Sequence, residues 1–364
     1  MQSLDEKFMA RALELAKLAW GQTHPNPMVG AVIVKNGKII SEGYHKKDGE
    51  AHAEINAIRN LKEPAEGAEI YVTLEPCSTK GRTGACCDAI IANKFKRVII
   101  GTLDPNPLHS GRALDVLKKA NIEVKYNVLK DECENLNFIF NYTITHKTAL
   151  LAIKYAQTKN GKIALNAGQP SRITEEAARE HAMHYRKLFP AIAVGFGTLV
   201  SDNPSLTFRS GDFESSSARF VFDRSLKCDA LNLGNYKLFS DKFKDKSFIV
   251  CDANSPQSKI DSLRKKGLNV VSLNSERGNE AKFWKAFKDY LFANRLSAVI
   301  VEGGSKILSS IANSQSQDYV FEYTSDKVFP DSALPAFDSA HPEIENPQFA
   351  DLAPDTCKFG FAKK

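Results

Sequence analysis

The sequence predicts two consecutive α/β domains, the first of them built in three layers. Its 364 residues are more than one hydrophobic core usually holds and are sufficient for two. In both halves, short apolar segments of strand length alternate with longer segments that have helical periodicity. The pattern restarts with a strand near residue 150, so we expect domains at 1–145 and 146–364. No internal repeat relates the two halves.

The first domain is expected to begin with a helix, because Ser3 and Glu6 form a capping box before an amphipathic segment. The prolines of His24-Pro25-Asn26-Pro27 then indicate a rigid loop. Asn36-Gly37 predicts a two-residue hairpin turn. Further strands and helices follow in alternation. We expect strands at 29–34, 38–44, 69–74, 97–102 and 122–126, and helices at 51–61, 86–92, 111–120 and 130–142.

The second domain continues the alternation and contains two glycine turns after buried strands. Gly195-Phe196-Gly197 is half of a dinucleotide-binding fingerprint, but Val200 replaces its third glycine. Gly303-Gly304 would let backbone N–H groups approach a phosphate at a helix N-terminus, although a tight turn without a ligand explains it equally well. We expect strands at 150–156, 191–195, 219–222, 247–251 and 297–302, and helices at 175–188, 259–266 and 280–294.

Composition and charge narrow the class of partner. The net charge of +6 suits an anionic small molecule such as a phosphate ester, and no run of five basic residues favours nucleic acid. Seven cysteines without regular pairing argue against a disulfide framework. The polar N-terminus does not resemble a signal peptide, and no apolar stretch is long enough to span a membrane. We therefore expect a cytoplasmic protein that binds neither membrane nor nucleic acid.

The residues between His52 and Cys87 contain the ligand types of a catalytic zinc site. His52-Ala53-Glu54 is followed by Pro76-Cys77 and then by Cys86-Cys87. Three protein ligands would leave a fourth position for water, whose pKa the metal lowers. Glu54 is suited to move protons, as in the general pattern of zinc deaminases. The spacing leaves open whether Cys86 or Cys87 is the third ligand, and whether the pair consists of ordinary buried thiols.

Two polar loop residues are weighed beside this site. Asn26 is expected to contact the substrate base or sugar, although a loop with a satisfied polar pair explains it almost as well. His45 is similar, and we do not include it among the site residues. A closed structural zinc site would need a fourth protein ligand nearby, and none is obvious in the sequence.

Taken together, these motifs resemble the deaminase half of the bacterial bifunctional riboflavin-biosynthesis deaminase/reductases. The eight residues between Cys77 and Cys86 include Gly81-Arg82-Thr83, whereas cytidine and tRNA adenosine deaminases have two residues there. The resemblance implies a cytidine-deaminase-like fold and hydrolytic loss of ammonia from 2,5-diamino-6-(5-phosphoribosylamino)pyrimidin-4-one. It implies that zinc is held by His52, Cys77 and Cys86, with Glu54 as the catalytic proton carrier.

The second domain is similar, more loosely, to the reductase half of the same family. That likeness implies a dihydrofolate-reductase-like fold and hydride transfer from NADPH to C1′ of the ribosylamino product. Guanidinium groups bind phosphate bidentately, so two arginines of this half suit the substrate phosphate. By position, the residues expected at NADPH are Ala156, Thr198, Asp202, Gly304 and Ser305, and those expected at the substrate are Arg186, Leu206, Arg209 and Glu302.

Several residues depart from the pattern of the reductase half. Pro170 stands where the family commonly has serine, and Arg172 where it commonly has tryptophan. We expect Ser171 to replace the missing serine at the substrate and Arg172 to pair with a cofactor phosphate. The segment after Gln317 also diverges.

Two other functions are considered beside this one. One is a zinc deaminase that acts on a nucleoside or an RNA base and carries a degenerate second domain. It predicts stacking aromatic residues and a basic groove beside the zinc site, and the first domain shows neither clearly. The other is a zinc module without catalysis. The sequence allows a homo-oligomer but does not specify one.

Overall fold

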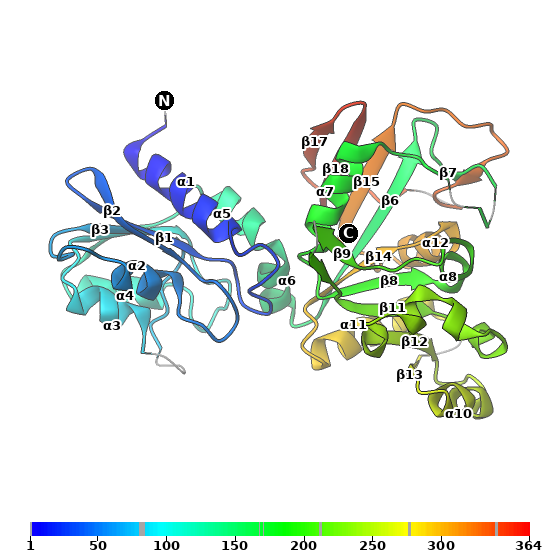
Figure 1. Cartoon of the computed structure of the whole chain (residues 1–364). Coiled ribbons are helices and arrows are strands. Elements are labelled where there is room, and N and C mark those ends of the chain that lie inside the picture. The colour runs from blue at the N-terminus through cyan, green and yellow to red at the C-terminus, as the bar shows by residue number, and fades with distance from the viewer. Residues whose placement is uncertain are drawn as a thin grey trace. The chain divides into compact units, whose positions relative to one another are not determined.

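The computed structural model describes residues 2–79, 84–166, 168–169, 171–210, 213–275, 278–338 and 341–364, without the side chains of 209, 210 and 213. The Gly81-Arg82-Thr83 motif and Pro170 therefore lie outside the described residues, as does the side chain of Arg209. The chain divides into two units, Met1–Lys147 and Thr148–Lys364 (Figure 1). This division lies two residues beyond the predicted boundary.

The first unit is a three-layer α/β domain. Its elements are α1 (Leu4–Lys17), β1 (Gly30–Lys35), β2 (Lys38–Tyr44), α2 (Ala53–Arg59), β3 (Glu69–Leu74), α3 (Cys86–Ala92), β4 (Arg97–Thr102), α4 (Arg112–Lys119), β5 (Glu123–Lys125), α5 (Lys130–Leu136) and α6 (Phe138–His146). The sheet order is β2-β1-β3-β4-β5, and β3, β4 and β5 are parallel. Helices α1 and α5 cover one face, and α2, α3 and α4 cover the other (Figure 1).

Local sequence signals account for several of these elements. The capping box is confirmed, because Ser3 Oγ accepts from the Glu6 N–H and Glu6 accepts from the Ser3 N–H. Asn36 and Gly37 have φ values of 51° and 73°, the left-handed conformation that the predicted hairpin turn requires. The single helix predicted over 130–142 is wrong, since it is broken at Asn137. The Asn137 side chain is buried and bonds both backbone polar groups of Met28, at 2.8 and 2.9 Å.

A buried carboxylate ties α1 to the sheet. Asp5 accepts hydrogen bonds from both Nη atoms of Arg97, from Lys125 Nζ and from Tyr71 Oη, at 2.7–3.0 Å. Burial alone would raise the pKa of Asp5, but the hydrogen bonds from Arg97, Lys125 and Tyr71 outweigh burial and lower the pKa to about 2. The ionised form of Asp5 therefore stabilises the folded unit.

We expect Asp5→Asn to lower the free energy of unfolding of the first unit by about 2 kcal/mol at pH 7. Because the folded pKa of Asp5 lies below its ordinary value of 3.8, this contribution is complete above pH 3.8 and is lost as the pH falls towards 2. Thermal unfolding of wild type and variant between pH 2 and 7 measures it. Asp131→Asn, at an exposed position, is the control. A constant difference between the Asp5 variant and wild type across this range would contradict the prediction.

The second unit contains a mixed nine-stranded sheet. Its elements are β6 (Leu150–Thr158), β7 (Lys162–Ala164), α7 (Glu176–Arg186), β8 (Ala191–Gly195), α8 (Phe196–Asp202), β9 (Phe208–Ser210), β10 (Phe213–Ser215), β11 (Ala218–Phe222), η1 (Lys227–Ala230), η2 (Leu233–Asn235), α9 (Lys237–Ser240), η3 (Lys244–Lys246), β12 (Ser247–Asp252), α10 (Gln257–Lys265), β13 (Asn269–Leu273), α11 (Glu280–Ala293), β14 (Ala298–Glu302), α12 (Ser305–Asn313), β15 (Tyr319–Ser325), β16 (Leu334–Pro335), β17 (Gln348–Leu352) and β18 (Asp355–Phe361). The strand order is β13-β12-β11-β8-β14-β6-β15-β18-β17.

The divergent C-terminal segment belongs to this sheet, which the sequence did not predict. Strand β15 pairs in parallel with β6 and antiparallel with β18, whereas β17 lies at the edge. Residues 201–209, for which neither a strand nor a helix was predicted, include the end of α8 and most of β9, which pairs with β10. No helix of the described residues is long and apolar enough to cross a bilayer.

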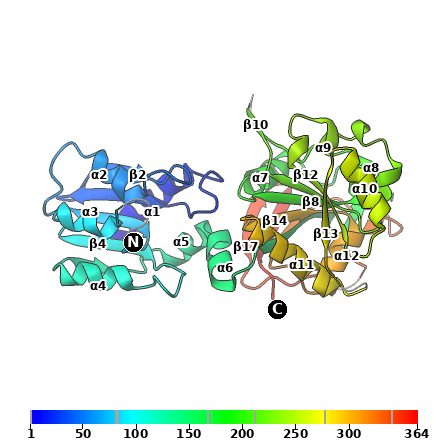
Figure 2. The ribbon, with the colours of Figure 1, turned by 90° about the horizontal axis from the view of Figure 1, so that it is seen from below.

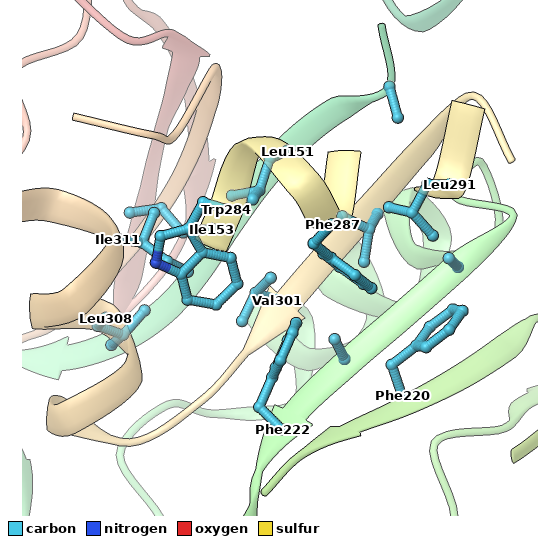
Figure 3. Packing of buried hydrophobic residues seen from close by; sticks show 14 of the residues in the cluster. Leu151, Ile153, Phe220, Phe222, Trp284, Phe287, Leu291, Val301, Leu308 and Ile311 are labelled. Atoms are coloured by element: carbon cyan, nitrogen blue, oxygen red, sulfur yellow. The ribbon is translucent and has the colours of Figure 1, made fainter. Parts of the chain in front are cut away.

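The main core of the second unit lies between the sheet and helices α11 and α12, which run along one of its faces (Figure 2). Trp284 and Phe287 of α11 and Leu308 and Ile311 of α12 are buried over the strands (Figure 3). The sheet residues that they cover include Leu151, Ile153, Phe220, Phe222 and Val301. On the other face, Tyr185 of α7 contacts Phe321 and Phe359. Burial on both faces fixes the carboxyl ends of β6, β8 and β14 in place.

Candidate active sites

Three predicted metal ligands meet in the first unit. His52, Cys77 and Cys86 each offer one ligand atom, and these atoms all lie within 4.8 Å of one another. His52 is the N-cap of α2, Cys77 follows β3, and Cys86 is the first residue of α3. Two helix starts and one strand end thus place an imidazole and two thiols together.

Close backbone packing sets the position of α2. A Cβ atom at Gly43 of β2 would lie 2.3 Å from the backbone nitrogen of Ala57, so α2 rests directly on this strand. The Ser41 hydroxyl donates to Ala57 O, and Asn56 Nδ2 donates to Tyr44 O at 2.8 Å. The start of α2, with His52, is thereby fixed against the hairpin.

The donor set fits zinc. Tetrahedral zinc, with Zn–N near 2.0–2.1 Å and Zn–S near 2.3 Å, places N and S ligands about 3.5 Å apart. His52 Nδ1 lies 3.6 Å from Cys77 Sγ and 3.3 Å from Cys86 Sγ. These three residues would hold the ion, and the set of two thiols and one imidazole matches a zinc preference.

The pKa values of the two thiols in the group are shifted in opposite directions. Hydrogen bonds from the Cys86 thiol, the His52 ring and the Cys86 backbone N–H hold the pKa of Cys77 well below its usual range. The contact with Cys77 raises the pKa of Cys86, as does burial. A divalent ion would displace the remaining proton, because metal-bound cysteine is a thiolate.

Glu54 lies in the first turn of α2, two residues beyond His52, and is 3% exposed. Burial raises the pKa of its carboxyl group. The same carboxyl group interacts with the Cys86 thiol. A buried carboxyl with a raised pKa beside the metal group can both accept and return a proton.

The adjacent Cys87 has a different environment. Its Sγ lies 3.8 Å from Pro76 O, it is fully buried, and burial raises its pKa to about 12. Cys87 also belongs to the hydrophobic cluster beneath the sheet. The structure therefore places Cys86, and not Cys87, in the metal group.

His45, set aside in the sequence analysis, also lies beside this group. Its ring centroid is 5.8 Å from that of His52, and its Nδ1 is 3.1 Å from Ala51 O. Its Nε2 is buried and has no hydrogen-bond partner among the described residues. The sequence did not indicate that this ring is buried, which only the fold shows. Asn26 donates a hydrogen bond to Asp48 Oδ1 at 2.9 Å. This is the satisfied polar pair that the sequence analysis gave as the alternative to a substrate contact.

In the second unit, adjacent parallel strands β8 and β14 end in the two predicted glycine turns. Helices α8 and α12 begin directly after them, with Gly195 and Gly304 as N-caps. A Cβ atom built at Gly304 would lie 3.9 Å from Thr198 Oγ1, so the two turns are neighbours. Neighbouring helix N-termini, whose first backbone N–H groups have no partner within the helix, favour a phosphate-bearing cofactor.

A charged cluster lies next to these turns, at the end of β14. Arg186 Nε and Nη2 donate to the two carboxylate oxygens of Glu302 at 2.8 and 2.7 Å, and Lys154 Nζ lies 3.8 Å from Glu302. Burial alone would raise the pKa of Glu302, but Arg186 and Lys154 outweigh it and lower the pKa. The sequence analysis did not single out Lys154, which lies on β6. A lysine after the apolar run of this strand was the feature that could have pointed to it.

The remaining predicted residues of this half are more dispersed. Ala156 lies on β6, and Asp202 ends α8. Arg172 is largely exposed and paired with Glu175 at 3.2 Å. Ser171 Oγ accepts from the Leu165 N–H, and Ser305 donates to Asp338 at 3.3 Å. Leu206 is buried in the segment before β9.

Comparison with known proteins identifies the family. Residues 2–102 match the cytidine and deoxycytidylate deaminase zinc-binding region, and residues 149–327 match the RibD C-terminal domain. The chain is 37% identical over 328 residues to riboflavin biosynthesis protein RibD of Aquifex aeolicus, covering 90% of this chain and 88% of the relative. The chain belongs to the RibD family. RibD of Bacillus amyloliquefaciens is 34% identical over 360 residues, with 97% and 95% covered.

A solved structure agrees with this assignment. The diaminohydroxyphosphoribosylaminopyrimidine deaminase/5-amino-6-(5-phosphoribosylamino)uracil reductase of Thermotoga maritima superimposes with a TM-score of 0.80 at 31% identity, over 98% of each chain. Like other RibD proteins, this chain is therefore a bifunctional riboflavin-biosynthesis enzyme, a zinc-dependent deaminase and an NADPH-dependent reductase. This confirms the predicted fold, function and cofactors over the alternative of a degenerate second domain.

Proposed function

We propose that the first unit removes ammonia hydrolytically from 2,5-diamino-6-(5-phosphoribosylamino)pyrimidin-4-one, and that the second reduces the ribosyl group of the product to ribityl with NADPH. The observation that carries the first step is the meeting of His52, Cys77 and Cys86 beside the buried Glu54. The Arg186–Glu302–Lys154 cluster beside two glycine turns supports the second step. The Thermotoga relative is named for the same pair of activities, a deaminase and a reductase.

In the deamination, zinc supplies a water of lowered pKa when it is bound. Glu54 takes the proton of the attacking water and delivers it to the departing amine, so that ammonia leaves and a carbonyl forms. The pKa of Glu54, raised by burial, suits a group that must hold the proton between these two steps. Two polar residues, Asn26 and His45, would orient the pyrimidine. Since His45 Nδ1 faces Ala51 O, its Nε2 is free to accept a hydrogen bond.

In the reduction, NADPH supplies a hydride to C1′ when it is bound. We place its phosphates at the turns of Gly195 and Gly304, with Ala156, Thr198, Asp202, Arg172 and Ser305 as further contacts. Reduction also needs a proton. We expect it to come from Lys154, which lies beside Glu302 together with Arg186. The substrate would lie against Ser171, Arg186, Leu206, Arg209 and Glu302.

The same proposal covers location and partners. The substrate is a small phosphorylated pyrimidine, so no nucleic acid or membrane partner is required. All seven cysteines are free in the structure, which is compatible with the reducing cytoplasm. A homo-oligomer remains a proposal to be tested by mass measurement in solution.

The decisive experiment supplies the diaminopyrimidine phosphate with and without NADPH and identifies the products by mass spectrometry. Without NADPH we expect the deaminated ribosylamino compound, and with NADPH the ribitylamino compound. The deaminated compound in both reactions would reject the second step alone. An unchanged substrate would reject the first.

We expect Glu302→Gln to lower kcat/KM for the reduction about tenfold or more, equivalent to ~1.4 kcal/mol of transition-state stabilisation. The substitution removes the anion between Arg186 and Lys154 and leaves two cations unpaired. Steady-state oxidation of NADPH with the deaminated substrate measures it. Deamination by the same chain reports on folding, and Glu343→Gln on the surface is the control. Equal reduction by variant and wild type would exclude a role for Glu302.

A further inference from the structure

Two arginines hold the backbone on either side of Leu206, one of the proposed substrate residues. Leu206 is buried and has a φ of 51°. This left-handed conformation is unfavourable for a residue with a branched side chain, so surrounding contacts must impose it. The contacts are hydrogen bonds from the two arginines to the backbone carbonyl groups of Ser205 and Thr207, the residues before and after Leu206.

The carbonyl before Leu206 is held by Arg219 of β11, whose side chain is fully buried. Arg219 Nη1 donates to Ser205 O at 3.0 Å and to Asp241 Oδ2 at 2.6 Å. Its Nη2 donates to Asp241 Oδ1 at 2.8 Å and to Leu238 O at 3.1 Å. The bidentate ion pair fixes the plane of the guanidinium group, and therefore the position of the Ser205 carbonyl.

The carbonyl after Leu206 is contacted by an arginine of the charged cluster. Arg186 Nη1 lies 3.4 Å from Thr207 O, and the same guanidinium group donates twice to Glu302. The hydroxyl groups of Ser205 and Thr207 are 3.2 Å apart and close the turn. Continuous contacts thus run from the buried pair Arg219–Asp241 through Leu206 to Glu302.

We infer that Arg219 is a positioning residue of the reductase site. By fixing the Ser205 carbonyl, Arg219 holds Leu206 in its left-handed conformation and so sets the wall against which the pyrimidine substrate binds beside Glu302. A buried ion pair gives little more stability than apolar side chains of the same volume. What apolar side chains could not replace is the fixed direction of its hydrogen bonds. The inference rests on the proposed function of the second unit.

The double variant Arg219→Gln/Asp241→Asn tests it, because it removes both charges and leaves none unpaired. We expect the KM for 5-amino-6-(5-phosphoribosylamino)uracil to rise about 10- to 100-fold, as misplacement of a binding wall does. NADPH affinity, measured by fluorescence titration, and deamination by the first unit should stay within twofold of wild type. Amide hydrogen exchange of residues 203–207 should become faster.

The matched control is Lys288→Gln/Asp318→Asn, which removes another buried ion pair of the same unit. Asp318 accepts a hydrogen bond from the Leu151 N–H at the amino ends of β6 and β15. Glu302 lies at the opposite, carboxyl end of the parallel strands. We expect this variant to lose thermal stability with an unchanged KM. Should both double variants raise KM in proportion to their loss of stability, Arg219 has only a structural role.

A conservative variant provides an independent check. Arg219→Lys keeps the charge beside Asp241 but has one nitrogen for several acceptors, so KM should rise less than in the double variant. If the wild-type enzyme reduces the substrate normally and both Arg219→Lys and the double variant keep the wild-type KM, the inference is overturned but the proposed function is not. Failure of the wild-type enzyme to oxidise NADPH with this substrate would instead overturn the proposed function, and the inference with it.

Discussion

The Glu54→Gln variant is expected to bind zinc as the wild-type enzyme does and to deaminate its substrate about 10²–10⁴-fold more slowly. Glutamine keeps the size of the side chain but cannot take a proton from water. Glu54 is not one of the three residues of the metal group, so zinc should remain bound. Burial already disfavours the ionised carboxyl of Glu54, and its replacement should not destabilise the unit.

Zinc content by mass spectrometry and single-turnover deamination measure the two effects separately. The exposed Glu63→Gln is the matched control, and reduction of the deaminated substrate by the same chain shows that the variant is folded. Loss of zinc together with activity would make Glu54 a ligand. Retention of both would leave a zinc module in which Glu54 has no catalytic role.

Exchanging one thiol of the adjacent pair should have a comparably large effect, and exchanging the other should have little. We expect Cys86→Ser to abolish deamination and to lower zinc affinity strongly. Loss of a residue that only supports a ligand costs about 10–100-fold in affinity, and loss of a ligand itself should cost more. Cys86 Sγ lies 3.3 Å from His52 Nδ1, whereas Cys87 Sγ lies 3.8 Å from Pro76 O. Cys87→Ser retains a donor to that carbonyl and should retain zinc.

Competition with a chromogenic chelator gives the zinc affinity of both variants, and deamination is measured in excess zinc. The two variants differ by one position, so each is the control of the other. Zinc lost in Cys87→Ser and kept in Cys86→Ser would assign the third ligand to Cys87. Loss in both would show that packing around α3, rather than one thiol, holds the site.

The chemistry of the first unit could be read from local patterns. His52-Ala53-Glu54 and Pro76-Cys77 carry ligand types and a carboxyl group at short spacings, and ligand preference depends on residue type. The capping box and the Asn36-Gly37 turn were equally local, and both were predicted correctly. The break at Asn137 was not, because its cause is a contact with Met28, 109 residues away in the chain.

The choice between Cys86 and Cys87 could not be made from spacing, since both lie in the first turn of the same helix. The orientation of α3 against β3 turns one thiol towards His52 and the other towards the core. His45 was left out of the predicted site for a similar reason. A polar side chain in a loop is informative only when its burial is known, and burial depends on the whole fold.

By itself, then, the sequence determined the classes of chemistry on offer: the metal-ligand types, the carboxyl group next to them and the glycine turns, whose properties are intrinsic to the residues. The tertiary structure alone decided how distant side chains combine in the second unit. Arg186 and Glu302 are 116 residues apart, and Lys154 joins them because β14 pairs with β6 in the sheet. Strand order is set by the burial of both faces of the sheet, which a linear pattern of residues does not specify.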